Sequence, residues 1–304
     1  MSAELYREQV SLLLRVLPIV GREEAFAVKG GTAINLFVRD LPRLSVDIDL
    51  AFLPLTEREA ALTSIHEALG RIAAGARRQI ASANVVVSGR REAPRLVVGA
   101  QGTLVKIEPN ATFRGSVFPP RMRRTTPAVE VEFQQSVSVP VLTEPDLYGG
   151  KIVAALDRQH PRDLFDVKLL LDADGLTDEV RTAFVVYLAS HGRPIAELLD
   201  PSLKPIGEAF GGDFAGMTRI KVTAQDLEDA RAELIRRLRR DLTRDEREFL
   251  LSVKRAEPRW DLMPVPHLSQ MPAIRWKLRN VAELAKRPRQ HNAAVEKLRR
   301  VLEV

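Results

Sequence analysis

The chain has 304 residues, of which 45% are hydrophobic, so it can bury one large core or two ordinary ones. It contains no cysteine, which excludes disulfides, thiolate metal sites and cysteine nucleophiles and fits a cytoplasmic protein. No apolar run reaches the roughly 18 residues of a membrane-spanning helix, and the apolar N-terminal stretch, cut by Arg15, does not resemble a signal peptide.

The net charge of +6 is unevenly distributed. Residues 226–304 hold 19 Lys and Arg against 13 Asp and Glu, whereas residues 1–225 hold 27 of each. A basic last quarter favours the backbone of RNA or DNA as a partner. A solvated helical surface that is rich in arginine is the alternative.

The N-terminal part of the chain alternates between helical and extended patterns. Residues 3–20 have the apolar spacing of an amphipathic helix. A short apolar strand, 26–28, leads into Gly30-Gly31, a helical segment follows at 32–38, and residues 44–52 alternate as a strand. Lys29, just before the glycines, is placed to meet a phosphate or is simply an exposed strand end.

The second strand carries two carboxylates on one face. Strand side chains repeat every two residues, so Ser45, Asp47 and Asp49 should project together, with the carboxylates about 7 Å apart. A glycine turn that opens a helix binds anions, and paired carboxylates bind Mg²⁺ together with substrate phosphates. The combination indicates a site for a nucleoside triphosphate and a metal ion. A chance Asp-x-Asp on a surface strand and a plain glycine turn are the alternatives.

A helix and a group of strands are expected next. Thr56 is a suitable N-cap for a helix that runs to about residue 78. Three strands follow at 84–88, 95–100 and 103–108. In the last of these, Lys106 and Glu108 share one face, opposite Val105 and Ile107.

A second polar cluster lies between residues 143 and 166. A helix should start after Thr143 and continue to about residue 158, with Lys151 on its otherwise apolar side. A lysine there must extend to solvent or reach an anion. Pro161 should start another helix, in which Asp166 lies four residues after Arg162 and is able to form a local ion pair with it.

The remaining residues, 176–304, are predicted to be mostly helical, with helices at 177–190, 226–240, 243–255 and 292–302. The helix at 226–240 carries most of a dense basic strip, which includes the candidate RNA-binding residues Arg236, Arg237 and Arg240. Trp260 and Trp276 are expected in the core, since that is the more common place for tryptophan, with base stacking as the alternative.

Two motifs together resemble the AbiEii/MenT-type toxins of the nucleotidyltransferase β superfamily, which belong to bacterial toxin–antitoxin and phage-defence systems. The first is Lys29-Gly-Gly-Thr-Ala33 followed by Arg43-Leu-Ser-Val-Asp-Ile-Asp-Leu50. The second is Lys151-Ile-Val-Ala154 followed by Arg162-Asp-Leu-Phe-Asp166. The likeness covers roughly residues 28–170 and continues, less specifically, around 258–260 and 272–280.

The resemblance implies a set of site residues. The family's essential residues match Ser45, Asp47, Lys151 and Asp166, and Asp49 matches the second acid of the superfamily pair. Asp47 and Asp49 would hold Mg²⁺ (or Mn²⁺). A third carboxylate would come from a later strand, either from Glu108 or from its rivals Glu130 and Glu132 in the segment 129–133. Nucleotide-binding residues would be Lys29, Gly30, Gly31, Thr32, Ser45 and Lys151, where Thr32 stands at the usual serine of the superfamily.

The resemblance also implies a fold and a reaction. The fold is α+β, with a nucleotidyltransferase domain at residues 1–175, built on a mixed sheet with flanking helices, and a mainly helical, basic domain at 176–304. The reaction transfers a nucleoside monophosphate, often a pyrimidine nucleotide, from an NTP to the 3′ end of tRNA and blocks translation. A cognate antitoxin would neutralise the protein. The alternatives are transfer to a protein or small molecule, and a non-catalytic RNA-binding module.

Overall fold

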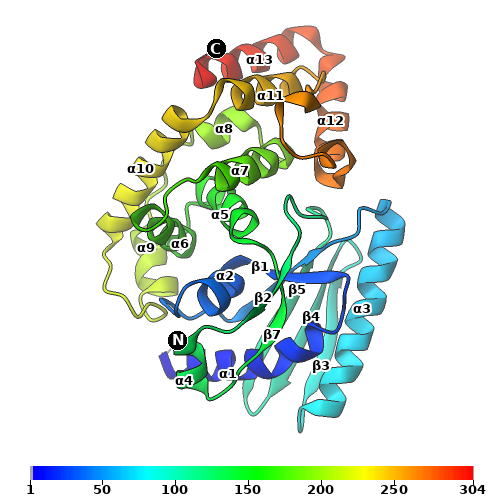
Figure 1. Cartoon of the computed structure of the whole chain (residues 1–304), viewed down its shortest axis with the longest axis vertical. Helices are drawn as coiled ribbons and strands as arrows, with labels where there is room; N and C mark the ends of the chain where they lie inside the picture. The colour runs from blue at the N-terminus through cyan, green and yellow to red at the C-terminus, as the bar shows by residue number, and fades with distance from the viewer. Residues whose placement is uncertain (1–2, 304) are drawn as a thin grey trace. The chain divides into compact units, whose positions relative to one another are not determined.

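A computed structural model describes residues 3–303 of the chain, which form two compact units (Figure 1). Unit 1 consists of Met1–Leu147 and Gly211–Lys221, and unit 2 of Tyr148–Phe210 and Val222–Val304. The division between them lies inside helix α5 (Glu144–Arg158), and so does not coincide with the domain boundary expected at residue 175.

Unit 1 is built on a seven-stranded mixed sheet with the strand order β3-β4-β5-β2-β1-β7-β6. Strand β2 is antiparallel to β1 and parallel to β5, while β1 is parallel to β7. In β4 and β5 buried residues alternate with more exposed ones, as expected of strands with one face on a core. The strands are β1 (Phe26–Lys29), β2 (Asp47–Phe52), β3 (Asn84–Arg90), β4 (Ala93–Ala100), β5 (Thr103–Asn110), β6 (Arg121–Arg124) and β7 (Ser138–Val141).

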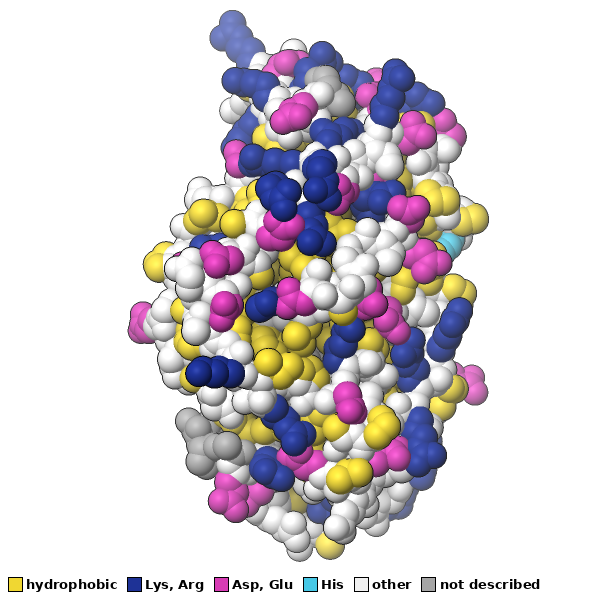
Figure 2. Space-filling model, turned by 60° about the vertical axis from the view of Figure 1, so that its left-hand side comes forward, with side chains coloured by type: hydrophobic (Ala, Val, Ile, Leu, Met, Phe, Trp, Pro, Cys, Tyr) yellow, Lys and Arg dark blue, Asp and Glu magenta, His cyan; other side chains and the backbone are white. Residues whose placement is uncertain are grey.

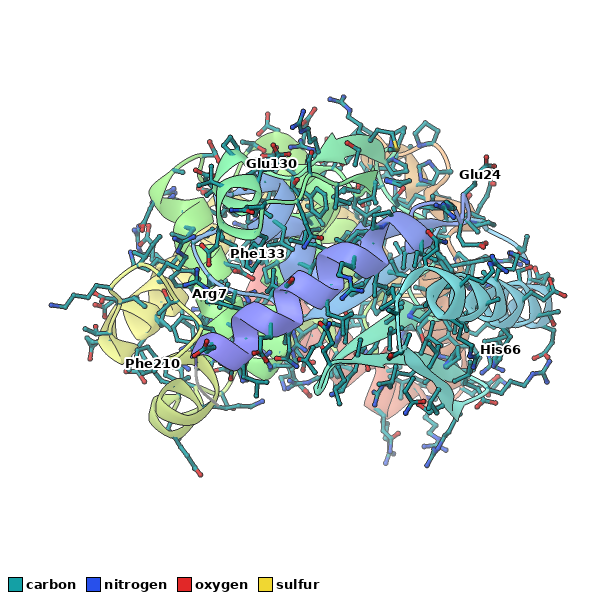
Figure 3. All side chains as sticks on the ribbon, turned by 90° about the horizontal axis from the view of Figure 1, so that it is seen from below. Arg7, Glu24, His66, Glu130, Phe133 and Phe210 are labelled. Carbon is teal, nitrogen blue, oxygen red and sulfur yellow. The ribbon has the colours of Figure 1, made fainter. Side chains whose placement is uncertain are left out.

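Two long helices, α1 (Ala3–Val20) and α3 (Arg58–Gln79), pack against the sheet and against each other. Figure 3 views unit 1 with α1 across the front. The apolar stripe of α1 is fully buried, as the amphipathic pattern of residues 3–20 predicts. Between β1 and β2, α2 (Gly30–Ala33) continues into a π-helical turn, Ile34–Val38 (η1). The α+β fold expected from the sequence is confirmed.

The start of α3 differs from the prediction in its cap. Its N-cap is Glu57, without a side-chain cap hydrogen bond, and not Thr56. The carbonyl of Thr56 instead accepts a hydrogen bond of 2.7 Å from Nη1 of the buried Arg114. The tertiary contact with Arg114 therefore replaces the local cap that the sequence predicts.

Residues 129–133 form part of helix α4 (Pro127–Phe133), although they alternate as a strand would. Pro127 at the first helical turn explains the difference, since its ring is pre-organised for a helix start. Glu130 accepts hydrogen bonds from Arg124 and Ser136, which lower its pKa to about 2. Glu132 pairs with two arginines, one of them Arg7 at 3.1 Å. Both carboxylates thus lie on a helix and not on a strand of the sheet, and both already have cationic partners within unit 1.

The regular secondary structure of unit 2 is helical throughout the described residues. Helix α6 packs along α10, which explains why the segment after Leu147 groups with the later helices and not with the sheet. Thr223 and Thr243 form capping boxes at the starts of α10 and α11. The main helices of unit 2 are α6 (Pro161–Asp172), α7 (Asp178–Ser190), α8 (Ile195–Leu199), α10 (Ala224–Asp241), α11 (Arg244–Lys254), α12 (Pro272–Ala285) and α13 (Pro288–Leu302), with short helical turns at α9 (Gly207–Ala209), η3 (Trp260–Leu262) and η4 (Leu268–Gln270). A further turn, η2 (Phe210–Phe214), lies mostly in the segment Gly211–Lys221 of unit 1. None of the described helices is both long and apolar enough to cross a membrane.

Candidate functional site

The turn between β1 and α2 depends on its two glycines. Gly30 has a φ of +72°, and a Cβ at this position would lie 2.4 Å from Oδ2 of Asp49. A Cβ at Gly31 would lie 2.6 Å from Nη2 of Arg43, a side chain that is itself buried. Any other residue at Gly30 would adopt a disfavoured left-handed conformation and displace the carboxylate. The glycine pair therefore lets the backbone approach the acidic strand closely.

Asp47 and Asp49 lie in β2, on the face opposite the core. Both are half-buried, whereas Ile48 between them is fully buried. The strand register sets Asp49 beside Lys29 of β1 and beside Glu108 of β5. Three residues that the sequence singled out separately thus occupy neighbouring positions on three adjacent strands.

Two hydroxyls lie beneath the turn. The Thr32 hydroxyl is 3.0 Å from Oγ of Ser45 and donates to the backbone carbonyl of Asp47. Thr32 and Ser45 are both buried, and Ser45 precedes β2, which begins at Asp47 and not at residue 44 as predicted. These hydroxyls tie the start of α2 to the start of the acidic strand and so hold the glycine turn beside the carboxylates.

A groove of about 310 Å³ opens within unit 1 beside Asp49, with Lys29, Arg95 and Glu108 among its lining residues. The carboxylate of Glu108 forms an ion pair with Nε of Arg95, so it already has a cationic partner. Among the described residues no three or more His, Asp or Glu side chains are arranged to hold a metal ion. Mg²⁺ often needs only one or two carboxylates plus substrate phosphates, so Asp47 and Asp49 fit an ion that arrives with a nucleotide.

The second predicted cluster forms in unit 2, between α5 and α6. Lys151, which is 8% exposed, extends its Nζ to within 3.1 Å of Oδ1 of Asp163 and 3.0 Å of Oδ2 of Asp166. The more exposed Arg158 reaches the other oxygen of Asp163, Oδ2, at 2.8 Å. Lysine on the apolar side of α5 thus meets anions, which is one of the two outcomes the sequence allows. Asp166 pairs with Lys151 across two helices.

The charges of this cluster determine its protonation. Burial alone would raise the pKa of Asp163, but the attraction of Lys151 and Arg158 outweighs it, so that its pKa lies below the ordinary value. Asp163 is therefore ionised at neutral pH. A buried cation that two acids hold in place is rigid and has a fixed orientation.

Three residues of these clusters were not identified as site residues from the sequence: Arg95, Arg158 and Asp163. The signal for Asp163 is its spacing, because residues 163 and 166 are three apart and share a face of the helix that Pro161 starts. For Arg95 no local signal exists, since it reaches Glu108 from a neighbouring strand.

The predicted RNA-binding arginines lie on α10, where each has an acidic neighbour. Arg236 and Arg237 both pair with Glu233, and Arg240 pairs with Asp241. Arg236 and Arg240 are exposed and Arg237 is partly buried. The strip is therefore less positive than its arginine content indicates.

Comparison with known proteins supports one family. No curated protein matches the chain. Among solved structures, the chain is similar in fold to MenT4, a nucleotidyltransferase toxin from Mycobacterium tuberculosis H37Rv, at 15% sequence identity, with a TM-score of 0.60 over 93% of this chain and 92% of that chain. A family model described as nucleotidyl transferase AbiEii toxin, type IV toxin–antitoxin system, matches residues 11–280. Because this match spans most of the chain and includes both clusters, the protein belongs to the AbiEii family of nucleotidyltransferase toxins.

Proposed function

We propose that the protein transfers a nucleoside monophosphate, preferentially a pyrimidine nucleotide, from an NTP to the 3′ end of tRNA. The extended or blocked tRNA then halts translation, and a cognate antitoxin neutralises the activity. The observation that carries the proposal is the glycine turn, where the absence of a side chain at Gly30 leaves room for the carboxylate of Asp49. A triphosphate and its metal ion need this combination of bare backbone and adjacent carboxylates.

The reaction follows from ordinary phosphoryl chemistry. The 3′ hydroxyl oxygen of the acceptor attacks the α-phosphorus of the NTP, a new P–O bond forms, and the bond to the β-phosphate oxygen breaks. Pyrophosphate leaves, and the hydroxyl proton passes to a base or to water. When bound, a divalent ion, Mg²⁺ or Mn²⁺, would be held by Asp47 and Asp49 and would supply positive charge beside the phosphates.

The residues of unit 1 bind and orient the nucleotide. In this proposal Lys29 and the amides of Gly30 and Gly31, at the start of α2, would contact phosphate oxygens. Thr32 and Ser45 act indirectly, because their buried hydroxyls hold the glycine turn in place. Substitution of either hydroxyl should therefore weaken nucleotide binding by loosening the turn.

Lys151 is proposed to offset the negative charge that moves onto the leaving pyrophosphate. Asp166 is completely buried and lies 3.0 Å from Nζ of Lys151. Of the roles open to it, its burial favours positioning of the lysine over direct contact with the nucleotide. Asp166→Asn should then lower kcat more than it raises KM for the NTP, whereas loss of a direct nucleotide contact would mainly raise KM.

The test is incubation of purified protein with total bacterial tRNA, Mg²⁺ and each α-labelled NTP in turn. Label should enter tRNA with one pyrimidine triphosphate and be absent with Asp47→Ala and Asp49→Asn. Asp172→Asn, which alters an exposed carboxylate of α6, is the matched control and should keep activity. No label on RNA from any NTP, given folded protein, would contradict the tRNA proposal and favour a protein or small-molecule acceptor. No pyrophosphate release with any acceptor would favour a non-catalytic RNA-binding module.

A further inference from the structure

The net positive charge of the chain lies at the end of unit 2, on α12, α13 and the residues that join them. Residues 272–304 hold 9 Lys and Arg against 3 Asp and Glu. Residues 226–271, which include the arginine strip of α10, hold 10 of each and are neutral. The surplus of +6 in the last quarter is therefore confined to its last 33 residues. Helices α12 and α13 pack together (Figure 1), and the end of the molecule that carries α13 shows many Lys and Arg side chains (Figure 2).

Several of these cations have no acidic partner. Arg279, Arg287 and Arg289 are exposed, and no acidic side chain that the structure describes is ion-paired with them. Arg236 and Arg240 on α10, by contrast, each pair with an acid of their own helix. An anionic polymer would therefore meet uncompensated charge on α12 and α13 but compensated charge on α10.

An exposed tryptophan lies within this basic surface. Trp276 on α12 is 56% exposed, contrary to the core position expected from its residue type. Trp260, the other tryptophan, packs on Phe249 with 6.1 Å between ring centroids. Arg279 follows Trp276 by three residues and so lies one turn away on the same helix face, while Ile274 faces the core. An aromatic ring beside unpaired guanidinium groups is suited to a nucleic acid, in which a base stacks on the ring and phosphates meet the cations.

The geometry points to α12 and α13 as a docking surface for single-stranded RNA, with one base stacked on Trp276 and the backbone phosphates on Arg279, Arg287 and Arg289. A single strand is favoured because only an unpaired base presents its face to a side chain. The identity of the docked strand rests on the proposed function, since the strand is taken to be the acceptor end of tRNA.

The test measures binding of the full-length protein to a fluorescently labelled RNA single strand of about 12 nucleotides, within the usual range of single-strand site sizes. Trp276→Ala should weaken binding about ten- to hundredfold, and Trp276→Phe should stay within a few-fold of wild type because a ring remains to stack on. Arg279→Ala/Arg287→Ala should weaken binding and lower the slope of log K against log salt by about 1.4, since each lost single-strand phosphate contact removes about 0.7.

The matched control removes the same charge from α10. Arg236→Ala/Arg240→Ala should leave affinity and salt slope close to those of the wild type, because both arginines already pair with acids. Unchanged binding in Trp276→Ala, stronger dependence on the α10 pair than on the α12 pair, or equal affinity for an RNA duplex of the same length would each overturn the proposal.

Nucleotide transfer measured in parallel separates this inference from the proposed function. If RNA binding depends on Trp276 but no NTP is transferred to any RNA, the docking surface stands and the proposed reaction fails. If transfer to tRNA proceeds and neither Trp276→Ala nor the arginine variant changes its KM for tRNA, the reaction stands and the docking surface is wrong.

Discussion

Replacement of Lys151 by methionine should destabilise the protein strongly, because the lysine is the buried cation that two carboxylates share. Its Nζ lies 3.1 Å from Asp163 and 3.0 Å from Asp166, and the latter carboxylate is completely buried. Breaking a buried ion pair by removal of one partner costs about 3–5 kcal/mol. Arg158 still reaches Asp163 at 2.8 Å, so we expect the loss to fall at the lower end, about 3 kcal/mol.

The measurement is urea-induced unfolding at pH 7, followed by circular dichroism. Lys168→Met is the matched control, since Lys168 is on the same helix as the acids and pairs with Asp172 near the surface. Such an i,i+4 pair contributes only about 0.3–0.5 kcal/mol. If Lys151→Met were as mild as Lys168→Met, the reasoning from burial would be refuted.

A triple variant separates folding from chemistry. Asp163→Asn and Asp166→Asn, added to Lys151→Met, remove the charges that the missing cation leaves behind, so most of the lost stability should return. If this folded variant transfers no nucleotide, at least one of Lys151, Asp163 and Asp166 takes part in the reaction as well as in the fold. Full activity in the triple variant would limit Lys151 to a structural role and contradict the proposed mechanism.

Three further predictions concern other positions. Gly30→Ala should lower the free energy of unfolding by about 1–2 kcal/mol, because its backbone is left-handed, and should abolish transfer by displacing Asp49. Gly70→Ala, which has open space around it in α3, should instead raise the free energy of unfolding by about 1 kcal/mol. Thermal unfolding and transfer assays on both variants check this. Glu108→Gln should lower the rate of nucleotide transfer less than about tenfold, because Glu108 is already ion-paired with Arg95, whereas Asp49→Asn should lower it more. An equal rise in the Mg²⁺ requirement of both variants would contradict this. Burial lowers the pKa of Lys277 to about 8, so the unfolded chain retains this proton up to a higher pH than the folded chain does. The free energy of unfolding should therefore rise by up to about 3 kcal/mol between pH 8 and 10.5. Lys277→Met should remove that rise in urea titrations.

Patterns formed by residues close together in the sequence predicted many of the helices and strands correctly. Period-two alternation gave the strands that became β3, β4 and β5, and the period of a helix gave α1. Thr177 caps α7 as expected, since its hydroxyl accepts from the backbone of Val180. These features arise from backbone geometry and local hydrogen bonds, which depend only on residues within a short stretch of the sequence.

Local patterns indicate the structure poorly where it depends on a contact with a distant part of the chain or where an element is very short. Residues 129–133 alternate as a strand does, yet they form a helix of two turns, too short for a helical period to be read, and Pro127 is the only local sign of it. The domain boundary expected at residue 175 stays a prediction, while the division at Leu147 follows from packing of α6 on α10, helices that are far apart in the sequence. Within the candidate site, the motifs identify Asp49 and Lys151, but the partners that fix their surroundings come from other elements.

The distribution of charge shows the same limit for function. A count of charged residues locates a basic quarter of the chain and directs attention to α10, where arginines are densest. The structure pairs the arginines of this strip with acids, and a compensated charge attracts an RNA backbone only weakly. On α12 and α13 the acids are too few to pair with every cation, and Trp276 lies among them. Affinity for RNA should therefore follow unpaired charge and not arginine content, and comparison of the α10 and α12 variants tests this distinction directly.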